Sequence, residues 1–141
     1  MKWIIKCFKN YGNFHGRARR KEFFTFFVFI ILLLFSVIYA DLKLRFDISV
    51  YIGISIIFIC PTYSVAIRRL HDMGKKEILA IFSILPIYIC FLFCAKYTLP
   101  RILVLSFIIL ANVLLYKKEG QPEENEYGPN PKEFELYDSN F

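Results

Sequence analysis

Residues 67–76, IRRLHDMGKK, separate two long apolar runs of the chain. These ten positions hold two arginines, a histidine, an aspartate and two lysines, whereas the runs on either side, 48–67 and 78–95, contain no charged residue. At about 1.5 Å of rise per residue, a helix of roughly 20 residues matches the hydrocarbon thickness of a bilayer. The pattern therefore predicts two membrane-spanning helices joined by a charged turn, with Gly74 as the left-handed residue that ends the first of them.

Two further apolar runs, 23–40 and 99–116, extend this pattern to most of the chain. Hydrophobic residues make up 57% of the 141 residues, above the roughly 45–50% of a soluble domain. A soluble fold of this size exposes too much surface to hide that many apolar side chains. Helices satisfy their own backbone groups in lipid, so we predict an all-α membrane protein with four transmembrane helices. The cysteines, which form no C-x-x-C pair, are predicted to be apolar fillers.

The two ends of the chain differ from this apolar centre. In the opening MKWIIKCFKN, lysines 2, 6 and 9 fall on one side of a helix and the apolar residues on the other. This predicts a short amphipathic helix at about 2–10, lying in the headgroup layer with its lysines facing anionic lipid. Residues 117–141 hold seven acids, three lysines and three prolines, which predicts an acidic, irregular tail that is extended unless it docks. We divide the chain into a membrane domain, 1–116, and a cytoplasmic tail, 117–141.

The distribution of basic residues predicts the orientation in the membrane. Of 18 lysines and arginines, 13 lie before the first run, between the second and third, or directly after the fourth, and four lie on the opposite side. The positive-inside rule then places both termini and the turn at 68–77 in the cytoplasm of a multi-pass protein.

This topology brings two charged segments to one membrane side: 14–24, FHGRARRKEFF, and the stretch quoted first. Asp72 lies three residues after Arg69 on its helix, so the two side chains can meet. An acid among many cations near lipid is a buried pairing partner, so we predict that Asp72 bridges its helix to the GRARR segment. The predicted charged cluster and binding site consists of Arg17, Arg20, Glu22, Arg68, Arg69, His71 and Asp72.

Three motifs in order along the chain, GRARRKEFF, RRLHDMGKK and NEYGPNP, resemble an uncharacterised family of bacterial inner-membrane proteins, domain of unknown function 805 (YhaH-type). The third motif matches the family pattern N-x-[YF]-G-P-D-P at Asn125, Tyr127, Gly128, Pro129 and Pro131. The chain departs from the family where Phe24 replaces tryptophan, KKEIL replaces R-S-G-W-W and Asn130 replaces aspartate. The resemblance implies a small protein of the bacterial inner membrane and implies no reaction.

Three functions remain open from the residues. We predict a binding or structural module whose cluster contacts anionic lipid headgroups or a membrane partner, which includes a second copy of the chain. A small oligomeric transporter is an alternative, although no Asp, Glu, Lys or His lies inside the runs. A membrane enzyme acting on a phosphorylated headgroup is a second alternative, although adjacent side chains such as His71 and Asp72 point about 100° apart on a helix. We predict no catalytic residue, metal or cofactor, and no nucleic-acid partner, because topology already explains the basic residues.

Overall fold

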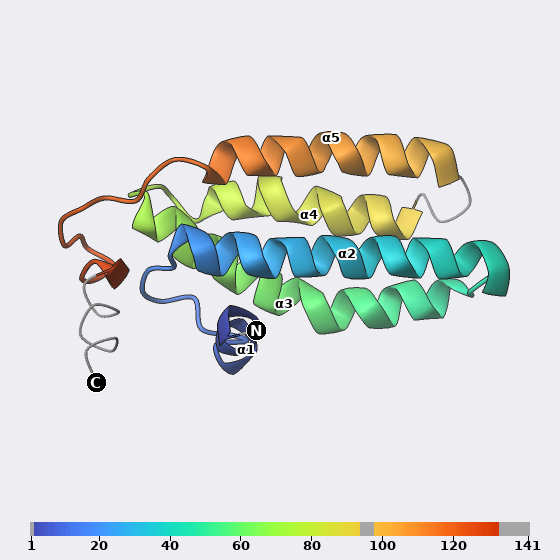
Figure 1. The fold of residues 1–141 in the computed structure, drawn as a ribbon, viewed down its shortest axis with the longest axis horizontal. Helices are drawn as coiled ribbons and strands as arrows, with labels where there is room; N and C mark the ends of the chain where they lie inside the picture. The colour runs from blue at the N-terminus through green and yellow to red at the C-terminus, as the bar shows by residue number, and fades with distance from the viewer. Residues whose placement is uncertain (1, 94–97, 133–141) are drawn as a thin grey trace.

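The computed structural model describes residues 2–93 and 98–132, which form five α-helices and no β-strand. The helices α2 to α5 lie side by side along the long axis of the molecule, and α1 lies across them (Figure 1). This agrees with the predicted all-α class. The bounds of the helices are α1 Lys2–Lys9, α2 Arg20–Leu44, α3 Ile48–Asp72, α4 Ile78–Phe93 and α5 Thr98–Tyr116.

Each of the four apolar runs lies in a helix of its own. The helix α2 extends beyond the predicted 23–40 at both ends, and α3 continues past residue 67 to include most of the charged stretch. Both are long and apolar enough to cross a membrane, whereas α4 and α5 contain shorter apolar segments, Ile78–Leu92 and Ile102–Tyr116. Residues 94 and 95, the predicted end of the third run, and the tail residues 133–141 lie outside the described residues.

Polar side chains join neighbouring helices inside the apolar bundle. The helix α3 packs against α2 and α4, and α4 packs against α5. The hydroxyls of Thr62 on α3 and Tyr88 on α4 are 2.8 Å apart, and those of Ser83 on α4 and Tyr116 on α5 are 2.7 Å apart. Asn112 on α5 donates to the Ser83 carbonyl at 2.9 Å. Such hydrogen bonds between helices supply the specificity that apolar contacts alone lack in lipid.

The N-terminal helix α1 packs its apolar face on the side of α2 and α3. The Phe8 ring meets Phe26, Phe29 and Phe58 edge-on, with centroids 5.6, 6.3 and 6.1 Å apart. After α1, the Tyr11 hydroxyl donates to the Ile57 carbonyl at 2.7 Å. Aromatic edge-to-face pairs of this kind add to the free energy of burial, so α1 is held to the bundle as well as to any surrounding lipid.

The end of α3 sets the direction of the chain toward α4. Gly74 has a φ of +64°, the Lys75 amide donates to the Leu70 carbonyl at 2.9 Å, and the Gly74 amide donates to the His71 carbonyl at 3.0 Å. These bonds form a Schellman motif, which glycine favours because it has no Cβ to clash in the left-handed conformation. The prediction for Gly74 is confirmed, and the turn starts α4 at the same end of the bundle as α2 (Figure 1).

Candidate functional site

The seven predicted cluster residues gather at the end of the bundle where α2 and α4 begin and α3 and α5 end (Figure 1). The Arg20 side chain keeps 41% of its surface exposed, and the other six residues are buried. Residues 117–130 of the tail cross the same end of the bundle. We call the six buried residues together with the docked tail the charged clasp: Arg17, Glu22, Arg68, Arg69, His71, Asp72 and residues 117–130.

Asp72 is the acceptor at the centre of the charged clasp. One carboxylate oxygen accepts from Arg17 Nε at 3.0 Å, and the other accepts from Arg69 Nη1. The side chains of Arg17 and Arg69 are 1% and 0% exposed, so both ion pairs are shielded from solvent. Because Arg17 precedes α2 and Asp72 ends α3, the bridge from α3 to the GRARR segment that the sequence predicted is confirmed.

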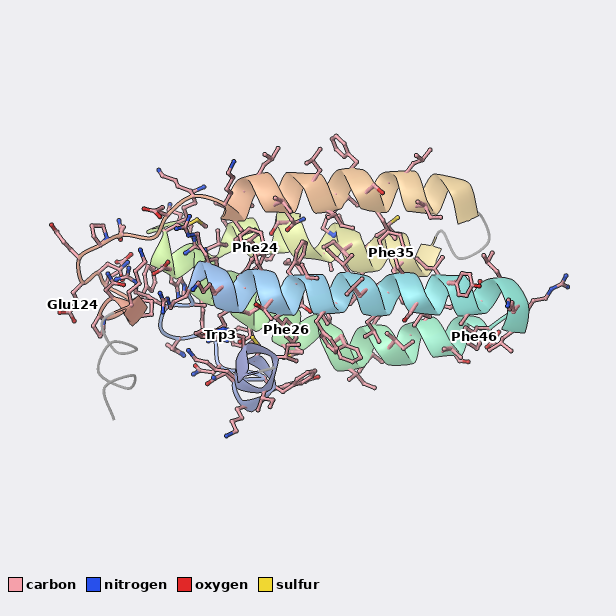
Figure 2. All side chains as sticks on the ribbon, in the orientation of Figure 1. Trp3, Phe24, Phe26, Phe35, Phe46 and Glu124 are labelled. Atoms are coloured by element: carbon pink, nitrogen blue, oxygen red, sulfur yellow. The ribbon has the colours of Figure 1, made fainter. Side chains whose placement is uncertain are left out.

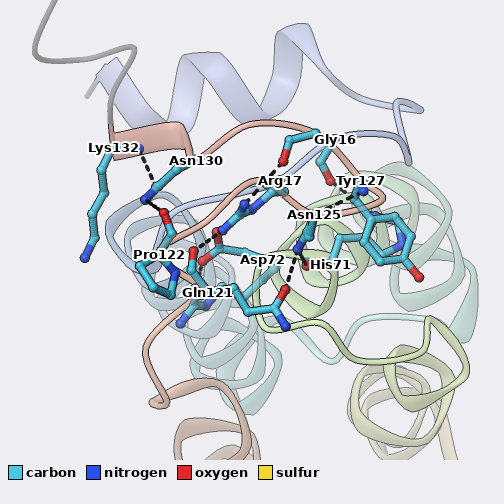
Figure 3. Close-up of polar contacts among 12 residues, drawn as sticks. Gly16, Arg17, His71, Asp72, Gln121, Pro122, Asn125, Tyr127, Asn130 and Lys132 are labelled. Carbon is cyan, nitrogen blue, oxygen red and sulfur yellow. Dashed lines mark hydrogen bonds and ion pairs between the residues drawn. The ribbon is translucent and has the colours of Figure 1, made fainter.

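Arg17 uses the rest of its guanidinium to hold the tail. Its Nη1 donates to the carbonyls of Glu123 at 2.8 Å and Gly128 at 3.2 Å, and its Nη2 donates to the carbonyl of Gln121 (Figure 3). The planar guanidinium carries five N–H donors in a fixed arrangement, so it can bind a carboxylate on one edge and carbonyls on the other. Arg17 lies in the first motif, and it therefore connects both this motif and the second, through Asp72, to the third.

Arg69 binds the tail in a similar way, nearer to the end of α5. Its Nη2 donates to the carbonyls of Tyr116 at 3.4 Å and of Lys118. The last carbonyls of a helix have no partner within it, so Arg69 satisfies an acceptor that α5 leaves open. The amide of Gln121 then donates to the main-chain carbonyl of Asp72 at 2.8 Å. These bonds lead the tail directly across the end of α3.

Glu22 forms a second buried ion-pair group that includes α1. One oxygen accepts from Arg68 Nη1 at 2.7 Å, and the Lys6 ammonium lies 2.9 Å from the other. Glu22 on α2 therefore pairs with an arginine of α3. Lys6 thus compensates an oxygen of a fully buried carboxylate while 43% of its own side chain stays exposed, and the lipid-facing position of the α1 lysines stays a prediction. Beside this group, burial above all, and then the Glu22 charge, raise the pKa of the Cys7 thiol to about 12.

His71 is enclosed rather than presented to solvent. Its ring stacks on Tyr127 with centroids 3.8 Å apart and planes 4° apart, and its Nδ1 lies 3.2 Å from the Gly16 carbonyl oxygen. Its Nε2 is 3.4 Å from a Glu77 carboxylate oxygen without hydrogen-bond geometry. The Asp72 carboxylate is bound to arginines instead of to the imidazole. Asp72 and His71 are adjacent in sequence but contact different residues of the clasp.

The third motif folds into a tight turn over these side chains. The amides and carbonyls of Asn125 and Gly128 bond to each other, and Asn125 Oδ1 accepts from the Tyr127 amide at 3.0 Å. Asn125 Nδ2 donates to the His71 carbonyl at 3.0 Å (Figure 3). Gly128 has a φ of +118°, which a residue with a Cβ rarely adopts. The turn therefore positions Tyr127 on His71.

Gly120 lets the tail pass close to Asp72. A Cβ at this position would lie 2.0 Å from an Asp72 carboxylate oxygen, which is far inside van der Waals contact. Sequence reasoning identified neither Gly120 nor Gln121 as site residues, and it left docking of the tail open. The Asn, Gly and Pro residues of the third motif were the signal that the tail has a defined conformation.

The charged clasp holds most of its charge in contacts within the protein. Three buried arginines meet two buried carboxylates, which leaves one positive charge in excess, and backbone carbonyls accept further arginine donors. Within residues 2–93 and 98–132, no three His, Cys, Asp or Glu side chains come together as ligands of a metal ion would. The basic side chains that remain exposed at this end include those of Lys21, Lys76, Lys117, Lys118 and Lys132, and Arg20 keeps part of its surface exposed.

This chain belongs to the family described as "Protein of unknown function (DUF805)", whose model matches residues 11–129 and so includes the first two motifs and the third as far as Pro129. Among its relatives is inner membrane protein YhaH of Escherichia coli K12, which is 32% identical over 94% of this chain and 98% of its own length. Inner membrane protein YhaI of the same organism is 29% identical over 94% of this chain and 97% of its own length. No solved structure matches the chain.

Proposed function

We propose that this chain is a multi-pass protein of the bacterial inner membrane with four spans and both termini in the cytoplasm. The names of its relatives support the location. The four apolar helices support the number of spans, since α4 and α5 reach about 24 and 28 Å, near the thickness of the hydrocarbon core. The 13-to-4 distribution of basic residues supports the orientation.

The apolar surface of the bundle supports the same assignment. Large side chains such as Leu32 on α2, Phe82 on α4 and Phe107 on α5 are 65%, 72% and 73% exposed. Exposed apolar residues are normal singly, but here they recur on α2, α3, α4 and α5 along the length of the bundle (Figure 2). Lipid acyl chains are the solvent that suits such a surface.

The biochemical role that the geometry supports best is binding of anionic lipid headgroups by a surface that the charged clasp holds in place. One observation carries this proposal: the basic residues at the charged end fall into two groups. Arg17, Arg68 and Arg69 are buried on partners within the chain, whereas Lys21 and Lys117 are exposed. The first group stabilises the end of the bundle, and the second presents charge to the membrane surface. Basic residues at this level attract anionic lipid by about 1 kcal/mol each.

Native mass spectrometry on the full-length protein tests this role. The protein would be taken from bilayers that contain equal parts of phosphatidylglycerol and phosphatidylcholine, and the retained lipids would be counted. We expect retention of phosphatidylglycerol above its bulk fraction. Retained lipid in the bulk ratio would contradict the proposal, since electrostatic attraction has to favour the anionic headgroup.

A further inference from the structure

A groove lies between α1, the first turns of α2 and the residue that follows α5. Its volume is about 470 Å³, and the side chains that line it are Trp3, Arg20, Lys21, Phe24, Thr25 and Lys117. Trp3 lies on α1 and Phe24 on α2, both toward the charged end of the bundle (Figure 2). We call this feature the Trp3 groove. Apart from Lys117, the first residue of the tail, its lining lies outside the charged clasp, although Arg20 belonged to the predicted cluster.

The lining of the Trp3 groove combines two kinds of chemistry. Arg20, Lys21 and Lys117 supply cationic groups, and no lining residue is acidic. Trp3 and Phe24 supply aromatic surface, and tryptophan is enriched where apolar and aqueous regions of a membrane meet. A ligand that fits both parts carries an anionic group directly attached to an apolar body. Membrane phospholipids of the anionic class have this composition.

The groove also lies at the level where such a lipid has its headgroup. The Phe23 ring of α2 stacks on Tyr116 of α5 with centroids 4.2 Å apart, so the two helices are joined one residue before Phe24 and Lys117. The apolar run of α2 begins at residue 23, and Arg20 and Lys21 precede it. The cations therefore flank the start of the apolar segment, and Phe24 lies within its first turn.

Arg20 already has an anionic partner on the surface of the protein. Its Nη2 binds the Glu119 carboxylate of the tail, and the Glu119 side chain is 69% exposed. Exposed ion pairs of this kind contribute little to stability, so an incoming phosphate can displace the carboxylate. Glu119 thus pairs with Arg20, a cation that lines the groove, and competes with the ligand for it.

We propose that the Trp3 groove binds one anionic phospholipid, with its phosphate among Lys21, Lys117 and Arg20 and its glycerol and upper acyl chain against Trp3 and Phe24. This inference rests on the proposed function, because it assigns the anionic-lipid preference to one built site rather than to a general basic surface. Neighbouring Lys6 is a weaker candidate for the phosphate, since its ammonium contacts Glu22.

The fluorescence of Trp3 tests the proposal directly, because it is the one tryptophan in the chain. The full-length protein would be placed in vesicles of equal parts phosphatidylglycerol and phosphatidylcholine, with either one lipid or the other brominated near the headgroup end of an acyl chain. Bromine quenches tryptophan on contact. We expect stronger quenching by brominated phosphatidylglycerol than by brominated phosphatidylcholine at the same mole fraction.

A Lys21→Gln/Lys117→Gln variant should lose this selectivity by about 25-fold in relative affinity, about five-fold for each basic residue. The matched control is Lys75→Gln/Lys76→Gln, which removes the same charge from the turn between α3 and α4 at the same end of the bundle. It should retain the selective quenching. Glu119→Gln should increase the selectivity, because it releases Arg20 for the phosphate.

Three results would overturn the inference. Equal quenching by both lipids would show that no anionic lipid occupies the groove, even if mass spectrometry finds anionic lipid elsewhere on the protein. Equal losses in the two double variants would assign the preference to diffuse charge. Quenching that weakens as the protein-to-lipid ratio rises would show that a second copy of the chain fills the groove. The proposed function has its own contradicting result, which is that the lipid retained in native mass spectrometry has the composition of the bulk bilayer.

Discussion

The charged clasp predicts a large effect for the substitution Asp72→Asn. Asp72 binds two arginines whose side chains are 1% and 0% exposed, so loss of its charge leaves two buried guanidinium groups without their carboxylate. Asparagine keeps one oxygen acceptor but turns an NH₂ group toward an arginine donor. Removing one partner of a buried ion pair costs roughly 3–5 kcal/mol. At roughly 3–4 °C per kcal/mol for a chain of this length, the apparent melting temperature should fall by roughly 10–20 °C.

A thiol-reactive fluorescent dye measures this change in detergent. Cys7 and Cys90 are buried cysteines, so the dye reports their exposure when the protein unfolds. The high pKa of the Cys7 thiol also keeps it unreactive in the folded protein, since the thiolate is the reactive form. The matched control is Glu119→Gln, which removes the carboxylate of an exposed pair with Arg20 and should cost at most about 1 kcal/mol.

Two results would refute the reasoning. An Asp72→Asn protein that melts within a few degrees of the unsubstituted protein would show that the two arginines find other partners or water. Equal destabilisation by Glu119→Gln would show that burial does not distinguish the pairs. His71→Ala does not serve as a mild control, because His71 is buried against Tyr127 and its removal leaves a cavity.

Two further predictions concern the tail and the topology. Gly120→Ala should collide with the Asp72 carboxylate and release the tail, so limited proteolysis should cut the tail several-fold faster, whereas Gly12→Ala, with no heavy atom within 4 Å, should be cut like the unsubstituted protein. Equal cleavage of both variants would argue against a close passage of the tail over Asp72. Reporter fusions after Asp47 should be periplasmic, and those after Lys75 and at the C terminus cytoplasmic; a periplasmic signal at Lys75 would contradict the four-span orientation.

The helices were predictable because their signals are local. Eighteen or more apolar residues in sequence form a helix in lipid whatever their tertiary neighbours, and Gly74 ends α3 through bonds within seven residues. The pairing of Asp72 with Arg17 followed from the topology, which brings their segments to one end of the bundle. The pairing of Lys6 was not predictable from the period of α1, because it depends on the buried Glu22 of another helix.

The sequence pattern also could not predict where the tail docks. Arg17 and Arg69 bind backbone carbonyls of Gln121, Glu123 and Lys118, and a carbonyl acceptor is present at every residue. An acidic composition with three prolines indicates an irregular segment, and it does not indicate which carbonyls face an arginine. The exposed groove beside Trp3 likewise arises from α1, α2 and the end of α5 together.

The sequence by itself determined the helical class, the positions of the four apolar helices and the grouping of charge at one end, since these depend on the length of apolar runs and on the residues that interrupt them. The packing of the helices sets which cations are paired inside the protein and which face outward. That division depends on contacts between residues such as Arg17 and Asp72, which are 55 positions apart and meet only when the helices pack. Burial then holds those pairs together, because separating charges in a low-dielectric interior costs far more than in water.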